Sequence, residues 1–224
     1  MRVLRIVDLS APLDEATVTY PGDPAPRFAV HSTIERDGFN LLSVQMGSQS
    51  GTHVDAPYHF EESAARIDEV PLERFIGRGV VVDASRLGAR EAITWAHVAP
   101  VAERLGPDSI VLLHTGWSRH AGSPVYFEHP YLDADACRRM LDLGVRTFLI
   151  DAINIDETPD DTHPGVGFPV HHLIAAVTGV IGENLRHLHA VTFDDPWVMV
   201  FPLAFQGADG APVRAVAVEF AAMP

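Results

Sequence analysis

The chain has one cysteine, Cys137, among its 224 residues. A single cysteine excludes an intramolecular disulfide framework and any Cys-x-x-Cys redox or metal motif. Cys137 lies in LDADACRRMLDLG, whose helical spacing predicts a small buried side chain rather than a nucleophile. No apolar run approaches the length of a membrane helix, and the opening MRVLRIVDLS is too short and too polar for a signal peptide. We therefore expect a cytoplasmic protein.

Positive charge is also scarce. The sequence holds 16 Lys and Arg against 30 Asp and Glu, a formal net charge of −14. This charge disfavours nucleic acids and anionic membrane surfaces as partners. With 47% hydrophobic residues, the chain can bury one sizeable core. We expect a single domain over residues 1–224, with no internal repeat or low-complexity segment.

Strand-like runs rich in Val, Ile and Leu outnumber helical ones. Strands are predicted at 4–9, 41–46, 79–83, 110–114, 147–151, 189–192, 198–203 and 213–220. Helical spacing is clearest over 93–105, 133–143 and 170–177; the second begins at the N-cap candidate Asp133 and ends at Gly144. Strands and helices do not alternate regularly, so we predict an α/β fold with a mixed β-sheet or small barrel and few helices. Loops rich in Pro and Gly at 20–27 and 155–169 are candidates for functional loops.

The densest group of reactive residues is SGTHVDAPYHF, residues 50–60, which holds His53, Asp55 and His59 within seven positions. In extended backbone, residues two apart point to the same side, so His53 and Asp55 are expected to project together. Pro57 cannot continue a central strand, and a turn there would bring His59 back over the same pocket. Two imidazoles and a carboxylate are plausible ligands for a divalent metal. The alternative is a scatter of polar residues at a strand end.

This segment resembles the signature of the cyclase family of metal-dependent hydrolases, H-x-G-T-H-x-D-A-P-x-H-F, whose best-known members are bacterial kynurenine formamidases. Similar blocks occur at 6–24, 67–83, 112–117 and 171–185, so the resemblance covers most of the chain. It implies a swivelling β/β/α architecture and hydrolysis of a small amide such as N-formylkynurenine, a step of tryptophan catabolism. It also implies one or two Zn²⁺ or Mn²⁺ ions per chain and a homo-oligomer, either a dimer or a tetramer.

The resemblance further implies metal ligands in the second half of the chain. The first histidine of the family's HHxLL block and the glutamate of its ENL block match His171 and Glu183. Glu183 also sits in the apolar run VIGENL, where an unpaired carboxylate would be costly and a metal would compensate its charge. An ion pair between Glu183 and Arg186 is the alternative. His172 is a weaker candidate, for a contact with substrate or with a ligand.

One position departs from the family signature. Where the family has its first metal-binding histidine, this chain has Gln49. Gln49 lies an even number of residues before His53 and Asp55, so in a continuous strand its side chain would face the same site. An amide oxygen is a neutral ligand, weaker than imidazole and better suited to harder cations than zinc. Gln49 would therefore bind a metal weakly, position a water molecule, or leave one metal site empty.

These groups together predict metal-assisted hydrolysis. A divalent cation lowers the pKa of its bound water to about 7 and polarises a carbonyl group. The leaving group needs an acid, and an imidazole suits neutral pH, so His59 is the candidate. The resemblance implies the same role, since the matching family histidine takes part in proton transfer.

Other residues carry weaker expectations. Tyr20 and Phe39 lie in segments that resemble substrate-side loops of the family, with core packing as the alternative for each. Trp117 is a candidate for lining a pocket for an aromatic substrate. His129, in a loop beside a proline, is expected to be solvated. Asp151 is expected to be buried at a strand end, while Asp156, Asp160 and Asp161 are expected to be solvated.

Three functional classes remain open. The first is a metal-dependent amidohydrolase acting on an aryl formamide or a related small amide. The second is another chemistry at the same site, such as isatin-hydrolase-like opening of a lactam or a dehydrating cyclisation. The third is a non-catalytic protein that binds a metal or a ligand. The presence of His53, Asp55, His59, His171 and Glu183 together argues against the third class.

Overall fold

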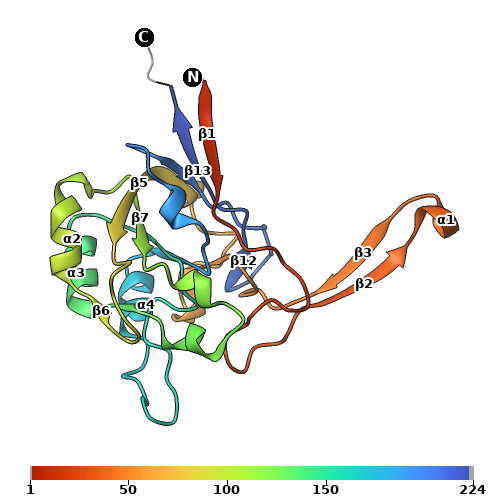
Figure 1. Ribbon diagram of the computed structural model, residues 1–224, viewed down its shortest axis with the longest axis horizontal. Coiled ribbons are helices and arrows are strands. Elements are labelled where there is room, and N and C mark those ends of the chain that lie inside the picture. The colour runs from red at the N-terminus through yellow and green to blue at the C-terminus, as the bar shows by residue number, and fades with distance from the viewer. Residues whose placement is uncertain (1, 222–224) are drawn as a thin grey trace.

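Nine strands form one curled mixed sheet in the computed structural model, which describes residues 2–221 (Figure 1). Their order across the sheet is β1-β13-β11-β5-β7-β9-β10-β4-β12. The central strands β5, β7, β9 and β10 run parallel, and the other neighbours pair antiparallel. The strands are β1 (Val3–Asp8), β4 (His53–Asp55), β5 (Ile76–Asp83), β7 (Ser109–His114), β9 (Thr147–Ile150), β10 (Val180–Glu183), β11 (Trp197–Met199), β12 (Gly210–Pro212) and β13 (Val216–Phe220).

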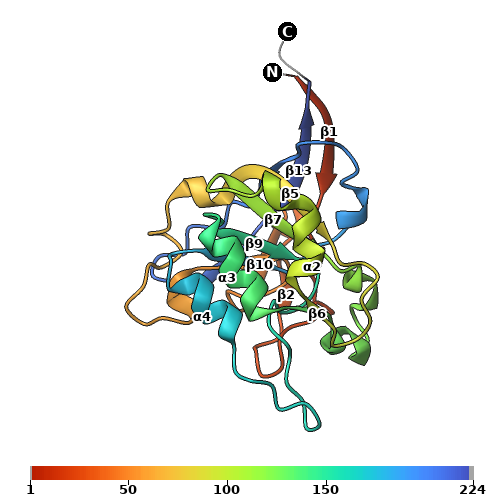
Figure 2. The ribbon, with the colours of Figure 1, turned by 90° about the vertical axis from the view of Figure 1, so that its left-hand side faces the viewer.

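The described residues hold four α-helices: α1 (Ile34–Asp37), α2 (Trp95–Val98), α3 (Ala134–Asp142) and α4 (Pro169–Ala175). Two small sheets complete the structure: the hairpin β2 (Arg27–Ser32) with β3 (Leu41–Gln45), and the pair β6 (Ala92–Ile93) with β8 (Tyr131–Leu132). Figure 2 shows α2, α3 and α4 together over one face of the central strands. The prediction of an α/β fold with a mixed sheet and few helices is confirmed. No helix in the described part of the chain is long and apolar enough to cross a membrane.

The central strands are buried on both faces, as is usual for parallel sheets covered on both sides. Val111 and Leu113 pack on the helix side, whereas Leu112 of the same strand packs on the opposite side. β9 repeats this alternation, with Phe148 toward the helices and Leu149 away from them. The two cores therefore follow from the two-residue period of extended backbone. The expectation of a single domain over residues 1–224 stays a prediction.

Most predicted elements form, and the exceptions have local causes. α3 is capped by Asp133, whose side chain accepts the N–H groups of Asp135 and Ala136, as predicted. The predicted helix over 93–105 is only a short α2 followed by a 3₁₀ helix, Ala99–Arg104, because Pro100 at its start cannot supply an α-helical hydrogen bond. The predicted strand over 189–192 is wrong. That region begins with the 3₁₀ helix Leu188–Ala190, which follows His187 in the left-handed region at φ 57°.

The sheet order brings the candidate residues together. β4 lies between β10 and β12, and its register pairs His53 with Glu183 and Asp55 with Ile181. Residues directly opposite in an antiparallel pair share a face, and so do residues two apart. His53, Asp55 and Glu183 therefore point to the same side of the sheet, toward α4. After Asp55 the chain turns at Pro57 into the 3₁₀ helix Pro57–His59, as predicted.

The β2–β3 hairpin, with α1 at its tip, projects away from the rest of the molecule (Figure 1). β2 was not among the predicted strands. The hairpin pairs with no other strand of the described chain, and all residues of β3 are exposed. Several large apolar side chains are exposed on it, namely Val30, Ile34, Phe39, Leu41, Leu42 and Val44.

Candidate metal-binding active site

A cavity of about 200 Å³ opens where β4, β10 and α4 meet. Its lining combines polar residues of these elements with the aromatic rings of Tyr20, Phe60 and Phe168. The cavity is lined by Tyr20, Asp23, Gln49, His53, Asp55, His59, Phe60, Ile153, Asn154, Phe168, His171, Glu183 and Asn184. Candidate residues from both halves of the sequence thus meet in one place.

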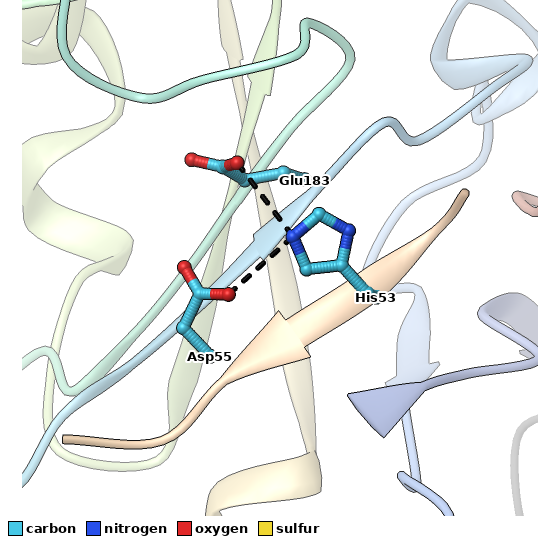
Figure 3. Close-up of side chains that lie close together, drawn as sticks. All are labelled: His53, Asp55 and Glu183. Atoms are coloured by element: carbon cyan, nitrogen blue, oxygen red, sulfur yellow. Dashed lines mark ion pairs between the residues drawn. The ribbon is translucent and has the colours of Figure 1, made fainter. Parts of the chain in front are cut away.

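His53, Asp55 and Glu183 lie together on the neighbouring strands β4 and β10 (Figure 3). His53 Nε2 is 3.4 Å from Asp55 Oδ1 and 3.7 Å from Glu183 Oε2. The other ring nitrogen, Nδ1, lies 2.8 Å from the carbonyl oxygen of Gly51. A carbonyl can only accept, so Nδ1 carries a proton and donates it, which leaves Nε2 directed at the carboxylates.

His171 brings a second imidazole from the first turn of α4. Its Nε2 is 3.5 Å from Asp55 Oδ2 and 3.5 Å from Glu183 Oε1. Its Nδ1 is 2.7 Å from Asp156 Oδ2, and Asp156 also accepts the backbone N–H groups of Val170 and His171. The expectation that Asp156 is solvated is wrong. It is 2% exposed, because it satisfies the open N–H groups at the start of α4 and orients the imidazole.

The donor set fits a divalent metal. Asp55 and Glu183 each present one oxygen to His53 and the other to His171. Asp55 Oδ1 is buried and has no hydrogen-bond partner among residues 2–221. An unpaired buried carboxylate oxygen is costly, and a cation would remove that cost. Two imidazole nitrogens with two carboxylates are a ligand set that suits Zn²⁺ and also Mn²⁺.

The two buried carboxylates, Asp55 and Glu183, favour a positive charge beside them. Burial lowers the pKa of His53, but Asp55 and Glu183 more than offset it and raise this pKa to about 9. Burial raises the pKa of the Glu183 carboxyl, and Asp55 adds to the rise. Protons on the imidazoles or a divalent cation would neutralise the same two carboxylates.

His59 stands at the edge of the cavity, beyond the turn at Pro57. Its Nδ1 lies 3.0 Å from Asp209 Oδ2. Burial lowers the pKa of His59, but the hydrogen bond to Asp209 and the charge of Asp55 raise it above its ordinary value. Asp209 was not predicted as a site residue. It directly precedes β12, 150 positions after His59 in the chain, and no spacing in the sequence connects the two.

Gln49 lines the cavity, but not for the predicted reason. A continuous strand through Gln49 and His53 is wrong, because residues 46–52 belong to no strand and β4 begins only at His53. The Gln49 amide Nε2 donates to Asp209 Oδ2 over 2.9 Å. Its role as a metal ligand stays a prediction.

The substrate-side candidates separate into two groups. Tyr20 lines the cavity, whereas Phe39, Trp117 and His172 do not, contrary to prediction. Trp117 is buried in the core and donates its indole N–H to Val125, and Phe39 lies on the projecting hairpin. His172 is exposed on α4. Its ring centroid lies 5.3 Å from that of Phe60.

Other predictions concern residues outside the cavity. His129 is buried rather than solvated, hydrogen-bonded to Thr158 and to the carbonyl of Pro130, and burial lowers its pKa to about 4. Asp151 is buried at the end of β9 and Cys137 is buried in α3, as predicted. The sequence offered no sign that Asp23 lines the cavity.

Comparisons with known proteins agree with this site. The model of the "Putative cyclase" family matches residues 7–157. The kynurenine formamidase of Bacillus cereus is 30% identical over 221 residues, which cover 96% of this chain and 98% of that enzyme. A solved structure named as a potential metal-dependent hydrolase with cyclase activity is 26% identical, with a TM-score of 0.79 and coverage of 97% and 99%. Isatin hydrolase A of Labrenzia aggregata shares the fold at a TM-score of 0.85 and 24% identity, with coverage of 96% and 93%.

Proposed function

This chain belongs to the cyclase family, and from that premise we propose that it is a metal-dependent hydrolase of a small aryl amide, with N-formylkynurenine as the leading substrate. The likeness to kynurenine formamidases over nearly the whole chain supports hydrolysis of an amide. The observation that carries the proposal is the convergence of two imidazoles on two buried carboxylates, one of whose oxygens has no partner within residues 2–221.

His53, Asp55, His171 and Glu183 would hold the metal, which we propose to be Zn²⁺ or Mn²⁺. Because each carboxylate faces both histidines, the four residues would suit one ion or two. When bound, the ion supplies an acidified water and an electrophile for the amide carbonyl. Gly51 and Asp156 hold the two imidazoles with Nε2 toward the cluster, so little reorganisation is needed on binding.

The residues of the chain supply the remaining chemistry. His59 lies within reach of the cavity and would take a proton from the attacking water and pass it to the leaving nitrogen. Phe60 packs against His171 with ring centroids 4.3 Å apart, and Phe168 packs against Phe60 at 5.2 Å. These rings exclude water from one side of the cluster and offer flat apolar surface to an aromatic substrate.

A second candidate is the opening of a small lactam such as isatin, and one observation favours it. No arginine lines the cavity within the described residues, and the chain has no lysine. A substrate with a free carboxylate, such as N-formylkynurenine, would find no arginine or lysine of this chain beside it. A neutral lactam needs none.

Turnover of both substrates by metal-loaded protein tests these proposals. We expect release of kynurenine or of isatinate, abolished by a chelator and restored by Zn²⁺ or Mn²⁺. His53→Ala and Asp55→Ala should lose both the metal, measured by elemental analysis, and the activity. His189→Ala, an exposed histidine outside the cavity, is the matched control. Absence of turnover on both substrates by protein with full metal content would reject the proposal.

We also propose that the chain forms a homodimer through its hairpin. An isolated two-stranded hairpin is marginally stable in water, yet this one exposes six large apolar side chains. A symmetric pair of copies can bury both hairpins reciprocally. Light scattering should give twice the chain mass, and Leu42→Glu with Val44→Glu should halve it without loss of metal. A monomeric wild type would contradict the proposal. A cytoplasmic location stays a prediction from the sequence.

A further inference from the structure

Three side chains from residues 48–59, far from Asp209 in the chain, converge on its carboxylate. Its Oδ2 lies 3.0 Å from His59 Nδ1 and 2.9 Å from Gln49 Nε2, and its Oδ1 accepts the hydroxyl of Ser48 over 2.7 Å. The backbone carbonyl of Asp209 also accepts the N–H of Ala56 over 2.8 Å, next to Asp55. The carboxylate is therefore fixed both through its own backbone and through its side-chain partners.

The orientation of the Gln49 amide follows from this contact. A carboxylate can only accept hydrogen bonds, so the amide nitrogen must face Asp209. The amide oxygen faces away from Asp209 and is buried without a hydrogen-bond partner among residues 2–221. The side chain lies flat against Gly210, where an added Cβ would come within 2.7 Å of Gln49 Nε2 and 2.8 Å of Oε1. Glycine at the start of β12 thus leaves the space that the amide occupies.

We propose that Asp209 is the positioning residue for His59, and that Gln49 holds Asp209 in place instead of binding the metal. This inference rests on the proposed function. Asp209 accepts the Nδ1 proton of His59, which fixes the tautomer with the lone pair on Nε2. No hydrogen-bond partner of Nε2 is found in the described chain, so this nitrogen is free for substrate and water.

The proton balance of the reaction closes within this arrangement. Nε2 accepts one proton from water as its oxygen bonds to the amide carbon. The imidazolium then donates that proton to the amide nitrogen as the C–N bond breaks, which gives an amine and a carboxylic acid. Throughout, Asp209 keeps its charge and stabilises the imidazolium. Gln49 is neutral and donates a hydrogen bond, so it restrains Asp209 without competing as a cation for its charge.

Asp209→Asn tests the positioning role. Asparagine keeps the shape of aspartate, but one of its two oxygens becomes an NH₂ group, so it cannot accept hydrogen bonds at both positions. We expect kcat to fall roughly 100-fold or more, with KM and metal affinity within about threefold of wild type. Asp68→Asn is the matched control: Asp68 is exposed and accepts the N–H of Gly207 in the same loop, but does not contact His59. ¹⁵N NMR of the metal-free protein, recorded at a pH where His59 is neutral, should show the Nδ1–H tautomer of His59 in wild type and in the control, and a mixture of tautomers in Asp209→Asn.

Gln49→Ala tests whether Gln49 holds Asp209 in place or binds the metal. It also provides a test if Asp209→Asn does not fold. We expect unchanged metal affinity and a decrease in kcat of roughly tenfold or less, since the bond from His59 to Asp209 remains. Loss of metal from Gln49→Ala would show that Gln49 is a ligand and overturn its assignment. Wild-type kcat in Asp209→Asn, or an unchanged tautomer, would overturn the role of Asp209. A wild type that hydrolyses no amide would instead refute the proposed function, which the NMR measurement does not depend on.

Discussion

Replacing Asp156 by asparagine tests whether the carboxylate behind His171 controls the metal site. Asp156 Oδ2 is 2.7 Å from His171 Nδ1 and 3.0 Å from the N–H of His171, and Oδ1 is 3.0 Å from the N–H of Val170. All three groups are donors toward a buried carboxylate. Asparagine has one acceptor oxygen, so its amide nitrogen must face at least one of these donors.

The expected size of the effect follows from this geometry. If the asparagine oxygen serves His171, the ring keeps a weaker, neutral acceptor and the Val170 N–H loses its partner. The imidazole is then less basic and less firmly oriented toward Asp55 and Glu183. Changes of this kind behind a metal-binding histidine cost about 10- to 100-fold in affinity, or roughly 1.4 to 2.7 kcal/mol.

Competition with a chromophoric chelator measures the affinity of wild type and variant for Zn²⁺. Asp161→Asn is the matched control, since Asp161 lies in the same loop and is exposed. Thermal melting of the metal-free proteins separates loss of affinity from loss of fold. Zinc affinity within twofold of wild type in a folded Asp156→Asn would refute the reasoning, and would mean that His171 does not need this carboxylate or is not a ligand.

Three further predictions follow from single residues. His59→Ala should keep its metal and lose roughly 100-fold or more in kcat; loss of metal in step with activity would make His59 a ligand. Burial lowers the pKa of His129 from 6.5 to about 4. As the pH falls from 6.5 toward 4, the unfolded chain takes up a proton on this histidine and the folded protein does not. The free energy of unfolding should therefore be highest above pH 6.5 and decrease by about 3 kcal/mol in total toward pH 4. Urea unfolding of wild type and His129→Gln at pH 7, 5.5 and 4.5 should show the extra acid sensitivity in wild type alone; parallel curves would contradict it. Gly182→Ala should lower the free energy of unfolding by about 1 to 3 kcal/mol, because the added Cβ would meet Leu149 Cδ2 at 2.4 Å; an unchanged melting temperature would contradict this.

Local patterns were sufficient for much of the fold. The apolar runs predicted β7 and β9, and the cap at Asp133 with Gly144 predicted α3, because backbone period and capping are properties of neighbouring residues. They missed β2, whose sequence RFAVHS mixes charged, polar and apolar residues. Its partner β3 (LLSVQ) was predicted from its apolar residues, although all of them are exposed.

The sequence by itself determined the shared face of His53 and Asp55 and the turn at Pro57, since both follow from the two-residue period and from the chemistry of proline. Only the tertiary structure decided that Glu183 stands opposite His53, that Asp156 orients His171, and that Asp209 lies against His59. These contacts join residues up to 150 positions apart in the chain. They depend on the order of strands across the sheet and on which buried donors remain to be satisfied, and neither property is written in the residues next to each contact.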